Sequence, residues 1–558
     1  MNIVGITNGP IFDTIQEASS PVALWFASAV FSEYTRMLCS RITAEISDAL
    51  ILSPYYDEYS DLSDGVGKFH DRIIFKSNET EVQLKDALKQ IIDRTKSEMI
   101  ELFLDSKFQD DESRKTDNGF SERDIESGRT FLQAYLYSEF VILSDENVQD
   151  NAVLAISDAL DAMELMRNFP DNDHGNPFRK LFAGRDAASN LYLKNCALLR
   201  KVTVKPNPLI DSDGNVLSIE KIARGSVSTA EDANCSGKLK KHYYYAVVSA
   251  DGDGMGNYLK KIDDAHVKDF SKCCFDYVVE AAARIHEFGG MPIYAGGDDM
   301  LFLAPVESTD GKKTIYKLCA EINDLFQRKL SENRELNAVK AIQDAPKPTI
   351  SFGIAIQFVK YPLYEALAES RYLLDGIVKS SKTTRNSMAV CLQKHSGQTI
   401  SLRISNPSEG RLEQYLTLGR TGASSENQKE EEQNETNVIR QLSQFSVVLE
   451  YLNQKATEPD SSVSRESYLT AWRNFFDNPA QEGFIQYLNE LGGMFYDDFL
   501  VTNVDEKKTI GIEIPEAILS CYEKNSDSRI QRYVQTLISI LRLRKFNVEK
   551  AGEEEISR

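Results

Sequence analysis

The sequence predicts an α+β protein with two tandem ferredoxin-like domains, a small domain inserted between them and an all-helical C-terminal domain. Two observations lead to this prediction. Strand-length apolar runs and helical stretches follow one another as β-α-β-β-α-β-α in residues 1–169, and the same order recurs in residues 243–400. That order is typical of the split βαβ, or ferredoxin-like, motif. The remaining C-terminal residues, 401–558, show mainly helical patterns.

The first predicted domain, residues 1–169, contains four strands and three helices. Strands are distinguished from helices here by the period of their apolar residues and by their length. The expected strands cover residues 2–6, 49–53, 72–76 and 134–143. The expected helices cover 13–40, 81–104 and 151–169, and the polar stretch 105–127 is expected to be a loop.

The second predicted domain, residues 243–400, repeats this order with clearer turn signals. Its first strand, 243–250, is followed by the Gly-rich stretch 251–256. A helix is expected over 257–288, and it stops at Gly289-Gly290, which is a typical C-terminal cap. A hairpin (291–305), a helix (312–331), a strand (349–358), a helix (362–379) and a last strand (387–392) complete the domain.

Two further regions lie outside these domains. Residues 170–242 are rich in turn residues and are expected to form the small connecting domain. Within the helical region 401–558, residues 421–437 are polar, acidic and almost devoid of apolar side chains. Such a composition cannot bury a core, so we expect a disordered loop there.

Composition limits the possible function classes. The 558 residues suit roughly three to five domains of ~100–200 residues. With 64 basic and 85 acidic residues, the formal net charge is -21. A free-standing nucleic-acid binder is usually basic, so any contact with RNA needs a local patch or a more basic partner.

The sequence shows no signal for a membrane or for secretion. It has no apolar run of 18 residues, and its first ten residues lack a basic region followed by an apolar core. Its eight cysteines form no Cys-x-x-Cys pair. These features favour a cytoplasmic protein with reduced thiols.

The hairpin 291–305 carries the strongest chemical signal in the chain. Its two apolar runs are joined by Gly296, Gly297, Asp298 and Asp299. The glycines permit backbone angles that side chains disfavour. Two adjacent carboxylates on a rigid turn supply the hard oxygen ligands that divalent cations prefer. A solvated Asp-rich turn is the alternative interpretation.

The predicted fold brings a third carboxylate to this hairpin. In a βαββαβ domain the first strand lies beside the hairpin, so Asp251 at its end is expected close to Asp298 and Asp299. Three such carboxylates suit two Mg²⁺ or Mn²⁺ ions about 4 Å apart, an arrangement that catalyses nucleotidyl transfer. Asp253 is expected either to act as a further ligand or to orient the loop.

Backbone and lysine groups near the acids are candidates for phosphate binding. The loop of Gly252, Asp253, Gly254, Met255 and Gly256 enters a helix, so its N–H groups are expected to face phosphates. Lys379, at the end of helix 362–379, either reaches a triphosphate as a point charge or caps the helix. No candidate general base of the His or Cys type is expected near the site, and the pair His70-Asp71 is treated as incidental. Phosphoryl transfer does not require such a base, because positioning and charge neutralisation dominate it.

Several motifs resemble one known family. SADGDGMGNYL, AGGDDMLFLAP and SFGIAIQFVKYPLYEALAESRYLLDGIVK resemble the second palm domain of the large polymerase/cyclase subunit of type III CRISPR effector complexes, Cmr (III-B) type. ITNGPIFDTIQEASSPVALWFASAVFSEYTRML resembles the first palm of that family. The resemblance implies two tandem GGDEF/polymerase-like palms, the first of them non-catalytic.

The resemblance also implies an activity and partners. In that family the GGDD palm converts ATP to cyclic oligoadenylate second messengers in an antiviral complex that holds guide RNA and target RNA. Asp251, Asp298 and Asp299 would bind the metal ions, and Gly252–Gly256 and Lys379 would lie against the triphosphate. The partners implied are the other subunits, the two RNAs and ATP.

The sequence departs from the family in two places. Many members begin with an HD nuclease domain, whereas the first palm here starts at residue 2, so no DNase activity is expected. Many members carry a zinc site between the palms, but this region offers only Cys196 and Cys235, which leaves zinc doubtful. Some members join ATP to S-adenosylmethionine, and that product stays open.

Two other functions fit the same residues. A stand-alone GGDEF-type dinucleotide cyclase shares the palm and hairpin, but it usually has Glu-Phe where Asp299-Met300 stand here, and it uses GTP. A scaffold subunit would bind nucleotide or organise RNA without catalysis, and the intact set of three acids argues against it.

Overall fold

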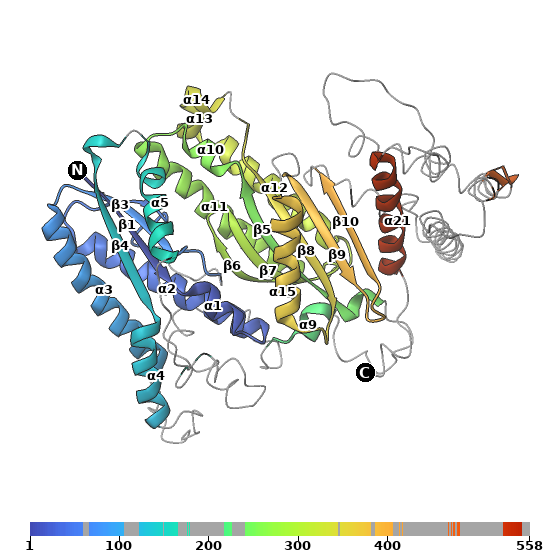
Figure 1. The fold of residues 1–558 in the computed structure, drawn as a ribbon, viewed down its shortest axis with the longest axis horizontal. Coiled ribbons are helices and arrows are strands. Elements are labelled where there is room, and N and C mark those ends of the chain that lie inside the picture. The colour runs from blue at the N-terminus through green and yellow to red at the C-terminus, as the bar shows by residue number, and fades with distance from the viewer. Residues whose placement is uncertain are drawn as a thin grey trace.

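A computed structural model shows where the predicted elements lie. It describes residues 1–59, 66–104, 122–148, 150–165, 217–225, 240–343, 346–380, 385–405 and 528–548, with isolated positions in 176–178 and 412–479. Strands and helices alternate along the chain, which confirms the α+β class (Figure 1). In the described part of the chain, no helix is both long and apolar enough to cross a membrane.

The N-terminal unit is built on a four-stranded antiparallel sheet with the order β2-β3-β1-β4. Val4 and Ile6 on one face of β1 join the core beneath α2, whereas Ile3 on the other face packs with Ile156 of α5. The strands are β1 (Asn2–Gly9), β2 (Leu50–Ser53), β3 (Arg72–Ser77) and β4 (Tyr137–Ser144). The helices are α1 (Ile11–Gln16), α2 (Pro21–Glu45), α3 (Glu81–Leu104), α4 (Glu122–Tyr135) and α5 (Ala152–Leu165), with a 3₁₀ turn at Asp145–Asn147.

The second unit is built on a six-stranded sheet with the order β10-β9-β8-β5-β7-β6. All neighbouring strands are antiparallel except β8 and β9. The strands are β5 (Tyr244–Asp253), β6 (Met291–Gly296), β7 (Asp299–Pro305), β8 (Thr349–Phe358), β9 (Ser387–Gln393) and β10 (Thr399–Ser405). Four of them repeat the arrangement of the N-terminal sheet, since β6-β7-β5-β8 corresponds in order to β2-β3-β1-β4.

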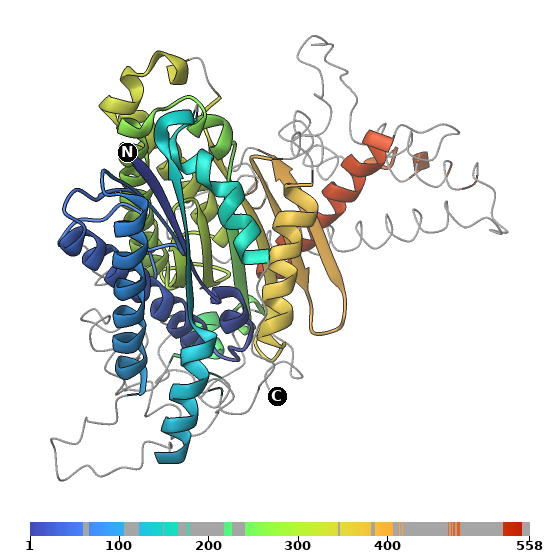
Figure 2. The same cartoon turned by 60° about the vertical axis from the view of Figure 1, so that its left-hand side comes forward.

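Helices cover both faces of the second sheet. The long helices α11 and α12 pack on one face, and α15 with a following π-helical turn packs on the other (Figures 1 and 2). The helices are α9 (Ile219–Arg224), α10 (Met255–Leu259), α11 (Asp264–Phe288), α12 (Ile315–Glu332), α13 (Arg334–Ala338), α14 (Lys340–Gln343), α15 (Leu363–Tyr372), the π-helical turn Leu373–Val378 and α21 (Ser528–Val548), with a 3₁₀ turn at Lys240–Tyr243. α21 lies along β10, and its Phe546 contacts Tyr244 at the start of β5 with ring centroids 4.8 Å apart.

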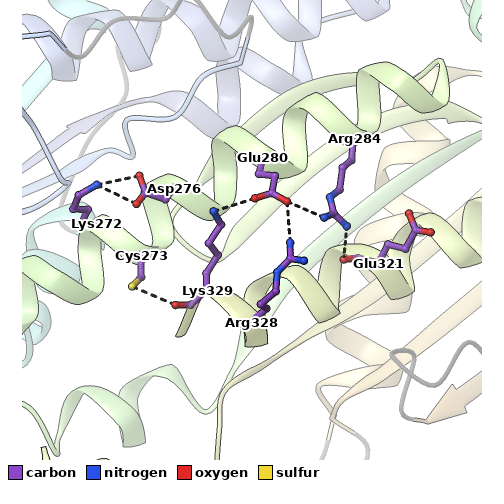
Figure 3. Close-up of polar contacts among 8 residues, drawn as sticks. All are labelled: Lys272, Cys273, Asp276, Glu280, Arg284, Glu321, Arg328 and Lys329. Carbon is purple, nitrogen blue, oxygen red and sulfur yellow. Dashed lines mark hydrogen bonds and ion pairs between the residues drawn. The ribbon is translucent and has the colours of Figure 1, made fainter. Parts of the chain in front are cut away.

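Ion pairs join α11 to α12 at the protein surface (Figure 3). Glu280 of α11 accepts hydrogen bonds from Arg284, 2.8 Å away on the same helix, and from Arg328 of α12, 2.9 Å away. Lys329 lies 3.0 Å from the same carboxylate. Exposed pairs stabilise a fold only slightly, so the apolar contacts beneath them must hold these helices in place.

Several predicted elements are divided differently in the structure. The helix expected over 13–40 is two helices, because Ser20 caps a new helix that has Pro21 in its first turn. The helix expected over 257–288 is also two, because Asp263 caps α11 after a break at 260–263. Both divisions depend on caps inside a continuous apolar pattern, which periodicity alone does not separate.

Other differences concern the ends of elements and one strand that the sequence analysis did not predict. The expected loop 105–127 gives way to α4 at Glu122, and β4 starts at Tyr137, after the expected start at 134. The prediction that 387–392 is the last strand was wrong, because β10 pairs with β9 beyond Gly397. Most of the expected connecting domain 170–242 and helical domain 401–558, with the loop 421–437, lies outside the described residues, as do Cys196 and Cys235.

The two units share a core and a buried ionic contact. One apolar cluster contains Ile3 and Ile156 of the first unit together with Tyr277 and Ile354 of the second. At its rim, Lys76 of β3 is only 7% exposed. Its ammonium lies 2.8 Å from Asp145 and 2.5 Å from Asp264, the first residue of α11.

The same contact includes the start of α5. The Asp264 carboxylate accepts a hydrogen bond of 2.7 Å from the Ala152 backbone N–H. Asn151 donates to the backbone oxygens of Leu259 (2.6 Å) and Ile262 (3.1 Å). The first unit therefore holds the connection between α10 and α11, and with it the position of α10.

We predict that Lys76→Met lowers the free energy of unfolding by about 3 kcal/mol, because it leaves two carboxylates together without their cation. Urea unfolding of the full chain measures this change. The control is Lys85→Met, since Lys85 makes an exposed pair with Glu81. An equal, small effect of both substitutions would show that the buried contact does not stabilise the fold.

Candidate nucleotidyl-transfer site

The Gly-Gly-Asp-Asp stretch forms the tight turn between β6 and β7. Gly296 pairs with Asp299 at the last rung of the hairpin, so Gly297 and Asp298 make the turn itself. Gly297 has a φ of +71°, a left-handed conformation that other residues adopt at a cost. The turn thus holds two consecutive carboxylates at the end of the sheet.

Strand register places Asp251 beside this turn. β5 pairs with β7 through Ala250 opposite Met300, so Asp251 is the next residue toward the turn. Asp251, Asp298 and Asp299 line one cavity of about 390 Å³. The structure therefore brings these three predicted site residues together at one end of the second sheet, while their catalytic and metal-binding roles stay predictions.

Gly252 allows the close approach of β5 to the turn. A Cβ atom on this residue would lie 2.3 Å from Asp298 Oδ2 and 2.8 Å from Met255 Cγ. Any side chain there would displace the carboxylate or the start of α10. This glycine is thus a steric requirement of the site, a role that differs from the phosphate contact expected for it.

The rest of the Gly-rich stretch divides between the sheet and a short helix. Gly254 precedes α10 with a φ of +76°, Met255 lines the cavity and Gly256 is exposed. Because β5 continues to Asp253, the expected loop is shorter than the sequence indicated, and α10 has five residues.

Asp253 has its own set of hydrogen-bond partners. It is buried, and its Oδ2 accepts hydrogen bonds from Ser351 Oγ (2.6 Å), Thr349 Oγ1 (2.9 Å) and the Asn386 N–H (2.9 Å). Asn386 has a φ of +51° just before β9. Asp253 therefore ties β5 to β8 and to the start of β9. These contacts suit the orienting role expected for it. Its Oδ1 is buried without a hydrogen-bond partner among the described residues, so the role as a further ligand stays a prediction.

The environment disfavours the charge of the hairpin acids. Burial raises the pKa of Asp298 to about 6, against hydrogen bonds from the N–H groups of Asp298 and Gly252. The Asp299 side chain is open to the cavity, yet desolvation by the surrounding protein raises its pKa to about 7. The negative charge of Asp298 raises this pKa further. The Tyr294 hydroxyl donates a hydrogen bond to Asp299 Oδ2. A bound cation would reverse these shifts, because a nearby opposite charge favours the ionised form.

Lys379 contacts one of the acids directly. Its ammonium donates to Asp251 Oδ2 and, over 2.8 Å, to the backbone oxygen of Gly252. Burial, together with the charge of Arg385, lowers the pKa of Lys379 to about 8. The lysine expected at the triphosphate is thus at the site, paired with an acid.

The first unit supplies the facing wall of the cavity, which sequence reasoning missed. His70 and Asp71 line the cavity, and a Cβ on Gly296 would lie 3.0 Å from His70 Cβ. His70 Nε2 lies 3.0 Å from Ser53 Oγ, and burial lowers its pKa to about 4. The expectation that no candidate base of the His or Cys type lies near the site was wrong for His70, which lines the cavity together with Cys274.

A signal in the sequence does point to this wall. The residues before β3 occupy the same place in their unit as the residues before β7 in theirs, because the two sheets share a strand order. His70-Asp71 is thus the counterpart of the acidic turn. A backbone bridge between Gly67 and Tyr294 joins the two segments, and Ala295 N–H donates to Gly67 O over 2.9 Å.

The carboxylate oxygens of the three acids suit a hard divalent ion, although in this structure their side chains do not point to one common position. Carboxylate oxygens are the preferred ligands of Mg²⁺ and Mn²⁺. Within the described residues, no three His, Cys, Asp or Glu side chains are close enough to hold one ion together. Asp251 is turned to Lys379 and Asp299 to Tyr294. Rotation of these two side chains would be needed for joint ligation.

Sequence comparison identifies the segment that carries the three acids. Residues 244–389 match the sequence model of the Cas10/Cmr2 second palm domain. This segment is similar to a Cas10/Cmr2-type palm domain. A curated relative, the CRISPR system Cmr subunit Cmr2 of Pyrococcus furiosus, is 28% identical over 181 residues, which cover 28% of this chain. The chain matches 19% of the length of that relative.

Solved structures with a similar arrangement come from type III complexes. A chain of the type III-B Cmr-beta complex bound to cognate target RNA has a TM-score of 0.48 and 10% identity, with 83% of this chain and 79% of that chain covered. A chain of a Csm1–Csm4 cassette in complex with cA4 has a TM-score of 0.41 and 12% identity, with 80% and 62% covered. These similarities are too distant to decide the fold or function of this chain.

We predict that Asp298→Asn stabilises the metal-free protein at pH 8. An aspartate whose folded pKa is raised costs no folding free energy below its ordinary pKa of 3.8, and the cost is complete once pH has risen past about 6. The variant should gain about 1–2 kcal/mol at pH 8, after allowance for solvent, and nothing near pH 3.5. Thermal unfolding at both pH values measures this, and a less stable variant at pH 8 would contradict it.

We predict that Gly252→Ala lowers any activity of this site at least tenfold, because the added methyl group overlaps the Asp298 carboxylate. Gly256→Ala is the matched control, since no atom lies within 4 Å of a Cβ there. Initial rates of both variants, compared with the unchanged chain, give the result. Equal rates would mean that the hairpin can move away from β5 without loss.

Proposed function

We propose that this chain is the large subunit of a type III CRISPR ribonucleoprotein complex and that its second palm converts ATP to cyclic oligoadenylate. One observation carries the proposal: three carboxylates from adjacent strands line one cavity within a segment that matches the Cas10/Cmr2 second palm. The proposed partners are the other subunits of the complex, guide RNA and target RNA. The relative named as a Cmr subunit supports this assignment.

The N-terminal unit is proposed to be the first, non-catalytic palm. Its strand order repeats that of β6-β7-β5-β8, which supports a tandem pair. Where β5 carries Asp251, its counterpart β1 ends in Asn8-Gly9. His70, Asp71 and Ser53 make this unit a wall of the cavity, so it would shape the nucleotide pocket without holding ions.

The residues of the chain would divide the work of the reaction. Two Mg²⁺ or Mn²⁺ ions at such acids supply activation of an attacking hydroxyl and charge neutralisation of the leaving pyrophosphate. Asp251, Asp298 and Asp299 would hold the ions, and β5 and β7 fix the spacing of the acids. The cavity walls would orient the base and ribose and exclude water, and Lys379 would face the phosphates. Positioning and charge provide most of the catalysis in phosphoryl transfer.

The proposal predicts that Asp298→Ala with Asp299→Ala lowers product formation on the order of a hundredfold or more, because it removes two metal ligands. The assay uses the complex reconstituted with guide RNA, target RNA, Mg²⁺ or Mn²⁺, ATP and S-adenosylmethionine, with products identified by mass spectrometry. The control is Asp324→Ala with Glu332→Ala, two exposed acids of α12.

Each result selects one function. Oligoadenylates that disappear in the double variant support the proposal, and an adenylylated methionine derivative would instead show that ATP is joined to S-adenosylmethionine. A dinucleotide made from GTP without RNA would show a stand-alone cyclase. Unchanged nucleotide binding with no product in any condition would show a non-catalytic scaffold subunit.

A further inference from the structure

Lys379 is held at the acidic site by an unusual stretch of backbone. It directly follows the π-helical turn Leu373–Val378, and its N–H donates to Leu374 O over 2.8 Å. The helix can lie directly on β8 because Gly353 has no side chain: a Cβ there would be 2.1 Å from the backbone oxygen of Ser370. π-Helical turns are often found at functional sites.

The ammonium of Lys379 occupies a defined position between two acceptors. It binds Asp251 Oδ2 and Gly252 O. Both partners belong to β5, and they precede Lys379 in the chain by 128 and 127 positions. The lysine side chain is 15% exposed, whereas the Asp251 side chain is 35% exposed toward the cavity. The pair is thus mostly shielded on the lysine side and open on the cavity side.

This position conflicts with a metal ion on the same carboxylate. An ammonium and a divalent cation on one oxygen would stand a few ångströms apart, and their repulsion is strong in a shielded site. The ammonium has to leave Asp251 Oδ2 when an ion binds there. The cavity beside it is where a polyphosphate would enter, and its oxygens would offer the displaced lysine a new anionic partner.

We propose that Lys379 is an exchange residue, which occupies Asp251 until a divalent ion and a nucleotide polyphosphate arrive together and then moves to the phosphates. This inference rests on the proposed function and adds a regulatory property to that site. An ion alone must displace the lysine at a cost, whereas an ion with a polyphosphate gives the lysine a replacement partner. Ion and nucleotide therefore bind cooperatively, and each strengthens the other by the same factor.

Binding of Mn²⁺ to the full chain, followed by electron paramagnetic resonance, tests the exchange. With Mn²⁺ alone, Lys379→Met should bind the ion about threefold to tenfold more tightly than the unchanged chain, because the competing charge is gone. With Mn²⁺ and α,β-methylene-ATP, the order should reverse, because the variant has no lysine for the phosphates. A lysine that merely fixes the rotamer of Asp251 would not produce this reversal.

Matched variants separate charge from packing. Lys379→Arg keeps the cation and should follow the unchanged chain in both titrations. Lys360→Met removes an exposed lysine after β8 and should change neither. If Lys379→Met fails to fold, as judged by thermal unfolding, Lys379→Gln takes its place.

Asp251→Asn distinguishes the two levels of the proposal. If this variant binds Mn²⁺ as tightly as the unchanged chain, the metal site of the proposed function is wrong. If it binds weakly while Lys379→Met shows no tightening, or no reversal with the ATP analogue, the metal site stands and the exchange is wrong. Weak binding by Asp251→Asn with both effects of Lys379→Met supports the exchange.

Discussion

The site depends on the pairing of β5 with β7, because this register decides whether three acids share one cavity. Asp251 follows Ala250, which faces Met300, and the acidic turn lies one step beyond. A shift by one residue would turn Asp251 to the opposite face of the sheet. Gly252 makes the register possible at this end, since only a residue without a side chain fits beside Asp298. A local steric constraint thus underlies the chemistry of the whole second unit.

This arrangement places negative charge where the protein alone does not favour it. Burial raises the pKa of Asp298 and Asp299, and the charge of Arg371 offsets only part of the shift at Asp299, whereas Asp251 pairs directly with Lys379. Sites built in this way are less stable than they could be, and the strain is relieved when a cation binds. A cation at these acids would remove this electrostatic cost, in line with the metal site proposed above.

The two units form one functional structure, even though only the second carries the acids. The segment before β3 presents His70 and Asp71 to the acidic turn, and Lys76 of β3 holds the start of α11. An apolar cluster continues from one sheet to the other. Movement of one unit relative to the other would therefore change the cavity.

The sequence alone determined the α+β class, the hairpin and the candidate acids, because these follow from local patterns: apolar period, paired glycines and adjacent carboxylates. It did not determine the caps at Ser20 and Asp263, because the apolar pattern there is equally compatible with one continuous helix. It also did not determine the additional strand β10, which pairs with β9. Only the tertiary structure decided that Asp253 faces β8 and that Lys379 pairs with Asp251. These contacts join residues about a hundred positions apart. They therefore depend on how the sheet and helices pack, which a local sequence pattern does not encode.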